Sequence, residues 1–237
     1  MKLLSLDCTA GPASVAIVEE GKVVSTAYAN VGLTHSQTLV PMVESALRCA
    51  NLTLPEIDRF AINAGPGSFT GVRIGAAALK GLTLDRGEVI VPVSTLESMA
   101  YNYAGVKDTV VCAAMDARCQ QVYTALFEVK GQTVHRLCDD CAITITELGE
   151  RIKERGRPAV LVGDGAELTH RTLAFPDELL TLAPQQLRYQ NAVGTALCAE
   201  QKCREGFAPI DSATLLPVYL RAPQAERELK KRQQDHN

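Results

Sequence analysis

The predicted order of strands and helices occurs twice along this chain, and this repeat constrains the fold more than any other feature. In the first copy, residues 3–7, 14–18 and 23–28 are apolar or alternating and predict strands. Residues 38–49 then place apolar side chains at helical spacing, and the apolar run 60–64 predicts a fourth strand. The first copy is therefore a βββαβ unit.

The second copy begins near residue 110 and keeps the same order. Strands are predicted at residues 110–116, 122–127 and 133–137, a helix from Thr144 or Thr146 to near Gly156, and a strand at 159–162. Two such units facing each other across a cleft are the layout of the actin, hexokinase and Hsp70 (ASKHA) folds. We therefore predict an α/β fold with two actin-like domains.

The domain boundaries follow from this repeat. Residues 1–104 form the first predicted domain, and the extended segment 208–223 returns to complete it. Residues 105–207 form a reduced second domain, in which only the helix 192–204 is clear after Gly165. The charged segment 224–237 is predicted to be a flexible tail.

Composition excludes some classes of protein. The 237 residues are 46% hydrophobic and 22% charged, with a formal net charge of -3, so no strong positive field attracts nucleic acid. No run approaches the roughly 18 apolar residues of a membrane span, and the apolar run at the start, residues 1–7, is too short for a signal peptide. We expect a cytoplasmic protein without membrane contact.

The eight cysteines predict free thiols rather than a disulfide framework. The pair Cys138 and Cys141 forms a C-x-x-C motif that suits either zinc or redox cycling. Cys198 and Cys203 are the natural second pair, but residues five apart on a helix point to different faces. We therefore expect no stoichiometric zinc.

The loop after the fourth strand is rich in glycine. Gly65, Gly67 and Ser68 precede a helical run, so backbone N–H groups and the helix N-terminus could face an anion. The loop lacks the Lys of a P-loop, and its glycine spacing is not G-x-G-x-x-G. The alternative is a tight turn that packs a helix on its sheet and binds no ligand.

Two acids end the first strands of the two copies. Asp7 with Thr9, and Asp116 with Arg118, are the remaining candidates for holding phosphate or metal. Phosphate-transferring members of this fold usually place a glycine two residues after the acid, where this chain has Thr9 and Arg118. Each acid could instead only cap its own turn. No histidine pair has ligand spacing, and no nucleophile motif is present, so we predict no catalytic residue.

The helix near residue 38 has an ambiguous start. Thr34 and Gln37 stand at capping-box spacing. Pro41 lacks a backbone N–H, which predicts that the first regular turn begins nearer to Thr38 than to Thr34.

Several segments resemble the bacterial TsaB (YeaZ) family. They are residues 34–41, 64–75, 92–96, 115–118 and 122–123, and the string G-P-G-S-F-T-G-V-R-I-G is the most specific of them. The resemblance implies a non-catalytic subunit of the machinery that modifies tRNAs reading ANN codons. That machinery puts a threonylcarbamoyl group on the adenosine next to the anticodon. The implied partners are the catalytic paralogue TsaD and the ATPase TsaE, with tRNA reached through the complex and a homodimer when the chain is alone.

The resemblance extends to the catalytic paralogue, which carries two metal-binding histidines four apart in a stretch matching residues 93–100. Thr95 and Met99 stand at those positions here, and neither suits an iron or zinc site. We therefore expect no metal and no tightly held cofactor in this chain alone. ATP or ADP at the joint with the catalytic partner is left open.

Small residues on the helix that follows the glycine loop suggest where a partner binds. Gly71, Gly75 and Ala78 recur at spacings of three and four, which predicts close approach of a second helix from this chain or a partner. The predicted partner interface comprises His35, Leu39, Val43, Gly71, Arg73, Gly75 and Ala78.

Two other functions compete with a partner-binding subunit. A free-standing kinase or ATPase of the same fold is the enzyme alternative, disfavoured by the missing glycines after Asp7 and Asp116. A Rossmann-type dinucleotide binder should carry its glycine loop after the first strand, whereas roughly sixty residues precede the loop here.

Overall fold

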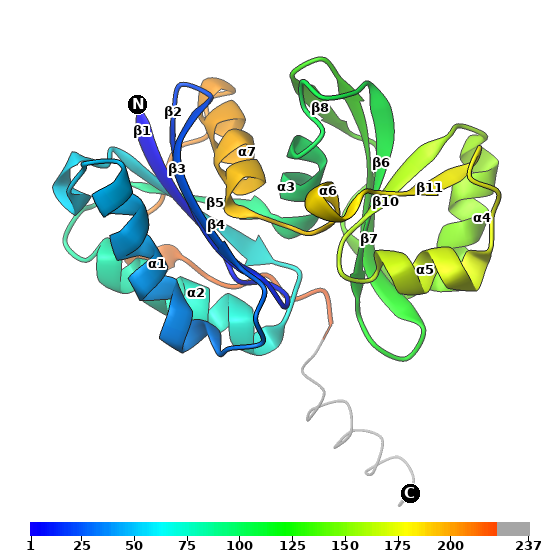
Figure 1. Ribbon diagram of the computed structural model, residues 1–237, viewed down its shortest axis with the longest axis horizontal. Helices are drawn as coiled ribbons and strands as arrows, with labels where there is room; N and C mark the ends of the chain where they lie inside the picture. Colours follow the sequence, from blue (N-terminus) through cyan, green and yellow to red (C-terminus); the bar gives the residue numbers. More distant parts are fainter. Residues whose placement is uncertain (222–237) are drawn as a thin grey trace, which may run out of the picture.

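The computed structural model describes residues 1–221, which form two lobes, each built on one sheet (Figure 1). The first sheet has the order β3-β2-β1-β4-β5 and the second β11-β10-β6-β7-β8, with β9 also paired to β7. The first sheet contains β1 (Lys2–Asp7), β2 (Ala13–Glu19), β3 (Lys22–Ala29), β4 (Arg59–Gly65) and β5 (Ile90–Ser94). The second contains β6 (Thr109–Asp116), β7 (Gln121–Lys130), β8 (Thr133–Arg136), β9 (Cys141–Thr144), β10 (Ala159–Val162) and β11 (Leu180–Leu182).

The two sheets share one topology. β1 pairs antiparallel with β2 and parallel with β4, and β6 pairs antiparallel with β7 and parallel with β10. In each lobe the central strand ends in an acid, Asp7 in β1 and Asp116 in β6. The predicted duplicated, actin-like α/β fold is confirmed.

Helices cover both faces of each sheet (Figure 1). They are α1 (His35–Cys49), α2 (Phe69–Leu82), α3 (Thr95–Tyr101), α4 (Ile145–Arg155), α5 (Ala166–Leu173), α6 (Gln185–Arg188) and α7 (Ala192–Arg204), with short 3-10 turns at Leu54–Glu56 and Ser212–Thr214. α1 and α2 pack on the outer face of the first sheet, and α4 and α5 on the outer face of the second. α7 and α3 occupy the inner faces and contact each other between the lobes.

The inner helices cross between the lobes. α3 lies within residues 1–104 but packs on β6 and β7, whereas α7 lies within residues 105–207 but packs on β1 and β2. The predicted domain boundaries stay a prediction. The predicted return of the chain to the first lobe is observed, because Ile210 pairs with Ile90 and Leu215 is buried in the first core. The predicted tail, residues 224–237, lies outside the described residues.

One helix begins earlier than predicted. α1 begins at His35 and contains Pro41, so the inference from proline was wrong. Burial of Leu39 and Val43 in the first core stabilises the turn in which Pro41 removes one hydrogen bond. Thr34 makes no side-chain cap, so the capping box is not formed. α2 begins at Phe69, inside the glycine-rich string.

The sequence analysis did not predict six short strands and helices: β5, α3, β9, α5, β11 and α6. They are three to eight residues long and partly polar, so their apolar periodicity is too short to detect. Among residues 1–221, no helix has the length and apolar character needed to cross a membrane.

The small-residue stripe of α2 faces the protein interior. A Cβ on Gly71 would lie 2.1 Å from the Cys8 carbonyl oxygen, and one on Gly75 would lie 2.7 Å from Cys8 Sγ. The nearest approach at both glycines therefore comes from the turn after β1, and the His35 side chain of α1 lies further from Gly71, 3.4 Å from the position of its Cβ. Gly71 and Gly75, like the core residues Leu39 and Val43, have no exposed surface to offer a partner, which corrects that part of the predicted interface.

Three predicted interface residues remain outside the core. Arg73 is exposed, with its guanidinium 3.8 Å from the Phe69 ring centroid and its Nε donating to the Tyr219 hydroxyl at 2.9 Å. Ala78 is half-buried. The half-buried His35 places Nε2 2.8 Å from the Ala10 carbonyl oxygen. Whether these three contact a partner stays a prediction.

The two kinds of glycine in α2 should respond oppositely to alanine. We expect Gly71→Ala to lower the free energy of unfolding by about 1 to 3 kcal/mol, because its Cβ meets backbone that cannot move aside. Gly81→Ala is the matched control, since nothing lies within 4 Å of its Cβ, and it should raise stability by roughly 0.5 kcal/mol. Urea titration of both variants measures this, and equal effects would contradict the described packing.

Candidate functional site

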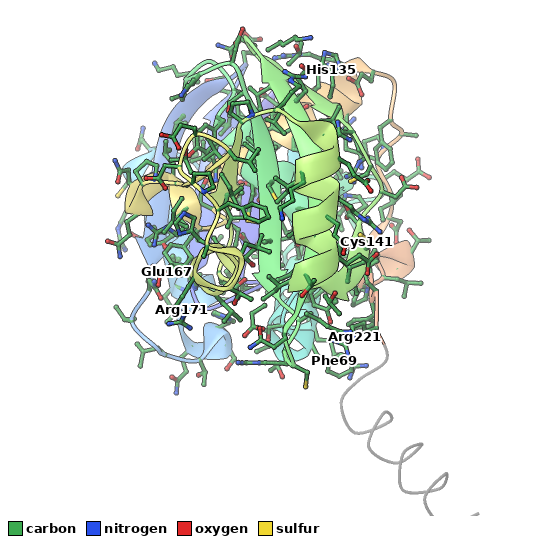
Figure 2. All side chains as sticks on the ribbon, turned by 90° about the vertical axis from the view of Figure 1, so that its right-hand side faces the viewer. Phe69, His135, Cys141, Glu167, Arg171 and Arg221 are labelled. Carbon is green, nitrogen blue, oxygen red and sulfur yellow. The ribbon has the colours of Figure 1, made fainter. Side chains whose placement is uncertain are left out.

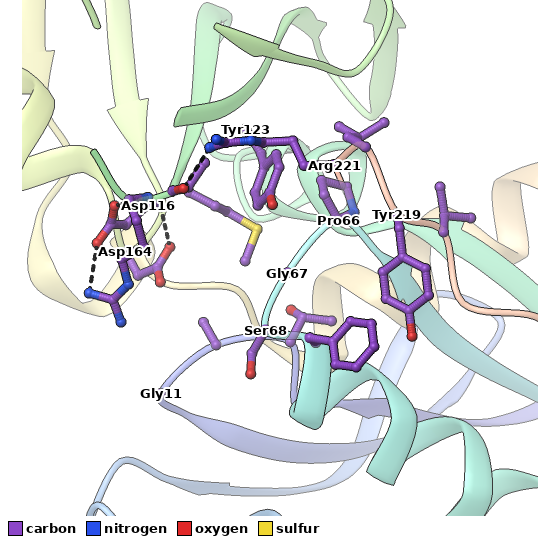
Figure 3. Close-up of a pocket in the computed structure, with 17 residues that line it drawn as sticks. Gly11, Pro66, Gly67, Ser68, Asp116, Tyr123, Asp164, Tyr219 and Arg221 are labelled. Carbon is purple, nitrogen blue, oxygen red and sulfur yellow. Dashed lines mark hydrogen bonds and ion pairs between the residues drawn. The ribbon is translucent and has the colours of Figure 1, made fainter. Parts of the chain in front are cut away.

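A cavity of ≈ 440 Å³ opens between the two lobes (Figure 3). The first lobe contributes residues 9–11 and 66–69, and the second contributes 115–118 and Asp164. The extended segment 218–221 lines the same cavity. The two strand-end turns and the glycine loop predicted from the sequence are thus brought to one place.

Asp7 holds its own turn and is not among the residues that line the cavity. Its Oδ1 accepts hydrogen bonds from the Thr9 amide at 3.0 Å and the Thr9 hydroxyl at 2.8 Å. The side chain is buried, Oδ2 has no hydrogen-bond partner, and burial raises the pKa of the carboxyl. This geometry is that of a turn cap.

The glycine loop is closed by the chain itself. The Ser68 amide donates to the Thr9 carbonyl at 2.6 Å, and the Ser68 hydroxyl accepts from the Gly71 amide at 3.3 Å. A Cβ on Gly67 would lie 2.5 Å from the Thr9 carbonyl oxygen, and one on Gly65 would lie 2.3 Å from the Val218 carbonyl oxygen. Glycine is therefore required here for close approach of backbone to backbone. Two amides that could bind an anion already have partners.

The second-lobe wall carries the charges. Asp116 Oδ1 accepts from the Arg118 amide at 2.7 Å, and Oδ2 pairs with the Arg118 guanidinium at 3.2 Å. Asp164 Oδ1 accepts from the Asp116 amide at 3.3 Å (Figure 3). Arg221 reaches across from the C-terminal segment and donates to the Ala117 carbonyl at 2.8 Å. Two carboxylates and two guanidinium groups thus border the cavity.

The sequence analysis missed Asp164 and Arg221. A signal for Asp164 was present, because the string Gly163-Asp164-Gly165 follows β10 as Gly65-Pro66-Gly67 follows β4. A Cβ on Gly163 would lie 2.1 Å from the Ala114 carbonyl oxygen, which repeats the close packing of the first lobe. Arg221 had no such signal, since its position depends on the path of the returning segment.

Asp164 makes the site sensitive to pH. Burial raises the pKa of Asp164 to about 6, although the side chain still meets water in the cavity. An acid whose pKa rises on folding binds its proton more tightly in the folded state. Its favourable contribution to the free energy of unfolding is therefore complete below about pH 3.9, the pKa of an aspartate in the unfolded chain. That contribution is lost as pH rises through about 6.

We expect Asp164→Asn to remove the loss of stability at high pH, because asparagine does not ionise. Its side-chain oxygen can still accept the hydrogen bond from the Asp116 amide. At about pH 8 the variant should melt at a temperature higher than that of the native chain by on the order of 2 °C. At about pH 4.5 the difference in melting temperature should be smaller. Thermal unfolding followed by circular dichroism at both pH values measures the difference. An identical gap at the two values would show that the carboxyl titrates normally.

The two positions matched to metal-binding histidines lie on α3. Thr95 and Met99 are both fully buried, and Met99 packs in the core beneath the second sheet. Thr95 Oγ1 has no hydrogen-bond partner in the described structure. Within residues 1–221, no group of three or more His, Cys, Asp or Glu side chains gathers as metal ligands. The expectation of a chain without metal stays a prediction.

The duplicated topology and the cleft between the lobes define an actin-like protein of the hexokinase and Hsp70 type. A family model described as TsaD, tRNA N6-adenosine threonylcarbamoyltransferase, matches residues 29–229. The chain is 34% identical to the Escherichia coli tRNA threonylcarbamoyladenosine biosynthesis protein TsaB over 180 residues, 75% of this chain and 74% of that one. It is 29% identical to the Bacillus subtilis TsaB over 168 residues, 71% and 73% of the two chains.

Solved structures agree. YeaZ from Pseudomonas aeruginosa superposes with a TM-score of 0.76 at 26% identity, covering 92% of this chain and 99% of that one. EutJ, an ethanolamine utilization protein from Carboxydothermus hydrogenoformans, has a TM-score of 0.53 at 13% identity, over 84% and 90% of the chains, and shares the fold alone. The chain belongs to the TsaB (YeaZ) family, whose members are named as tRNA threonylcarbamoyladenosine biosynthesis proteins. The predicted resemblance is confirmed.

Proposed function

We propose that this chain is a non-catalytic subunit in the threonylcarbamoylation of tRNA. It binds and supports the catalytic TsaD paralogue, together with the TsaE ATPase, in modifying N6 of the adenosine next to the anticodon in tRNAs that read ANN codons. Alone, the chain forms a homodimer, and it meets tRNA through the complex. The names of its relatives and the matched family model support its place in this pathway.

The closed glycine loop is the observation that carries the non-catalytic role. An ATP-cleaving member of this fold needs free backbone amides after its first strand and at its glycine loop to wrap phosphates. Here the Ser68 amide is 2.6 Å from the Thr9 carbonyl, and the Thr9 hydroxyl and amide both bond to Asp7. The residues suited to phosphate are therefore used to hold the first lobe together.

A nucleotide at the joint with the partner is compatible with the cleft. The chain alone holds no cofactor tightly in this proposal, because the Thr9, Ser68 and Gly71 amides already have partners within the first lobe. Arg118 and Arg221 line the cavity on the opposite side and could meet phosphate oxygens of ATP or ADP when a partner completes the site.

The outward face of α2 is the surface we assign to the partner. Arg73, Ala77 and Gly81 are exposed and follow one another at spacings of four, so they form one stripe beside the buried glycines. Small side chains at Ala77 and Gly81 allow a second helix to approach closely. This stripe replaces the buried Gly71 and Gly75 of the sequence prediction.

Ala77→Trp tests this surface. The variant should fold with an unchanged melting temperature, because Ala77 is exposed, yet co-purify at least about tenfold less with TsaD, since a loss of 1.4 kcal/mol in binding is tenfold in affinity. Val106→Trp is the matched control: Val106 is 62% exposed in the loop before β6, far along the chain from α2. Undiminished binding by Ala77→Trp would move the partner surface elsewhere.

A free-standing kinase or ATPase of this fold is the second candidate. Asp116 and Asp164 both line the cavity, and the Asp116 backbone amide bonds to the Asp164 carboxylate. This arrangement favours the kinase or ATPase, because two neighbouring acids could hold a magnesium nucleotide. Turnover of ATP by the isolated chain separates the two functions. We expect turnover far below the enzyme-like range of about 1 per second, and a rate within that range, abolished by Asp116→Ala, would favour the enzyme.

A further inference from the structure

Cys138 and Cys141 flank an irregularity in the second sheet. Arg136 lies opposite Phe127 on β7, so an uninterrupted ladder would place residue 139 opposite Thr124. Cys141 stands there instead. Two extra residues therefore form a bulge between β8 and β9.

The bulge brings the two cysteines to neighbouring positions along β7. The Leu137 amide donates to the Leu126 carbonyl at 2.8 Å, so the register of β8 continues as far as the residue before Cys138. Neighbouring positions on a strand are about 3.4 Å apart, and the bulge adds to that spacing. A disulfide needs Cα atoms about 4.4 to 6.8 Å apart, and placement of the two cysteines opposite adjacent residues of β7 is the arrangement on which the proposal rests.

Both sulfur atoms are held against the same short stretch of β7. Cys138 Sγ accepts from the Leu126 amide at 3.2 Å, and Cys141 Sγ lies 3.6 Å from the Thr124 carbonyl oxygen. Residues 124 and 126 present these atoms on the same edge of the strand, since alternate residues share an edge. Both thiols therefore contact one three-residue stretch of β7.

The bulge is fixed on the other side by Asp140. Its carboxylate accepts from the Ser94 hydroxyl at 2.5 Å and forms an ion pair with Arg136. Arg136 also pairs with Glu97 at 2.8 Å. These contacts tie the residues between the cysteines to the start of α3 and keep the bulge in its observed shape.

The thiols are reachable from solvent. Cys138 lines a small cavity of ≈ 290 Å³ together with Arg151 and Arg155 of α4, and both cysteines are partly exposed. Arg151 Nη1 lies 3.4 Å from Cys141 Sγ, where it favours a thiolate, although burial raises the pKa of Cys141 overall. Figure 2 labels Cys141 beside this helix. The cavity also contains Glu154, and Arg151 pairs with Glu147 at 2.9 Å, so its charge is mixed and access rather than attraction is what it offers a reagent.

We propose that Cys138 and Cys141 form a reversible disulfide by exchange with a low-molecular-weight disulfide such as oxidised glutathione. Cys138 thiolate attacks one sulfur of the reagent and releases one glutathione thiolate. Cys141 then gives up its proton, and its sulfur attacks Cys138 Sγ and displaces the second glutathione. Two protein thiols are oxidised and one small disulfide is reduced to two thiols.

A glutathione buffer and peptide mass measurement test this proposal on the full-length chain. The tryptic peptide 137–151 contains both cysteines and no other. After the native protein is equilibrated with oxidised and reduced glutathione and then alkylated, this peptide should lose two hydrogens and both alkylation sites. Excess dithiothreitol should restore both sites.

Three comparisons make the result decisive. Cys141→Ser should trap one glutathione on Cys138, because no second thiol completes the exchange. Cys203→Ser is the matched control and should leave peptide 137–151 as in the native chain. The exposed Cys119 serves as an internal reference that forms only a mixed disulfide.

The proposal is overturned by any of three results. Peptide 137–151 could carry two glutathiones, its thiols could stay alkylatable while Cys119 is modified, or the bridge could form only in denaturant. The last result would mean that the folded bulge holds the sulfur atoms apart. Circular dichroism of the treated protein establishes that the exchange took place in the folded state.

Discussion

The approach of the turn after β1 to the start of α2 is the contact on which the first lobe depends. The Thr9 carbonyl oxygen receives the Ser68 amide at 2.6 Å, and the Cys8 carbonyl oxygen occupies the space where Gly71 would carry a Cβ. Backbone packed this tightly against backbone excludes side chains, so the glycines are required by the fold. A loop that resembles a phosphate cradle is thus filled by its own chain.

The second lobe also uses glycines for close backbone packing, but against different neighbours. Gly163 and Gly165 pack against the backbone of β6, whereas Gly65 meets the Val218 carbonyl of the returning segment and Gly67 meets the Thr9 carbonyl of the turn after β1. The residue between Gly163 and Gly165 is Asp164, whose carboxylate lines the cavity, whereas Pro66 stands between Gly65 and Gly67. The carboxylates at the cleft therefore belong to the second half.

The sequence predicted the strands of both units because each is an apolar or alternating run with clear turns around it, even where, as in β3 and β8, most of the strand is exposed. It also predicted the closure of the first lobe by the segment that contains Leu215. It gave the wrong direction for the stripe at Gly71 and Gly75, because spacing shows which residues share a helix face and not which neighbour that face meets. Asp164 and Arg221 were missed since their position at the cleft depends on tertiary packing.

The chain belongs to the TsaB family, whose members are named as tRNA threonylcarbamoyladenosine biosynthesis proteins. Under the proposed function it contributes a surface to a partner, and the packing at Thr9 and Ser68 joins the turn after β1 to the start of α2 in the first lobe. The same proposal assigns the charged second-lobe wall to a ligand that a partner would complete.

The most direct test is the threonylcarbamoyladenosine content of tRNA in a reconstituted reaction containing TsaD, TsaE and tRNA, with and without this chain. The account predicts that modification requires the chain. It also predicts that the double variant Asp116→Asn, Asp164→Asn supports at least half of the modification rate that the native chain supports. A twofold loss of rate corresponds to a rise of under about 1 kcal/mol in the activation barrier. Modification that proceeds equally well without the chain, or that is abolished by the two substitutions while binding to TsaD persists, would contradict it.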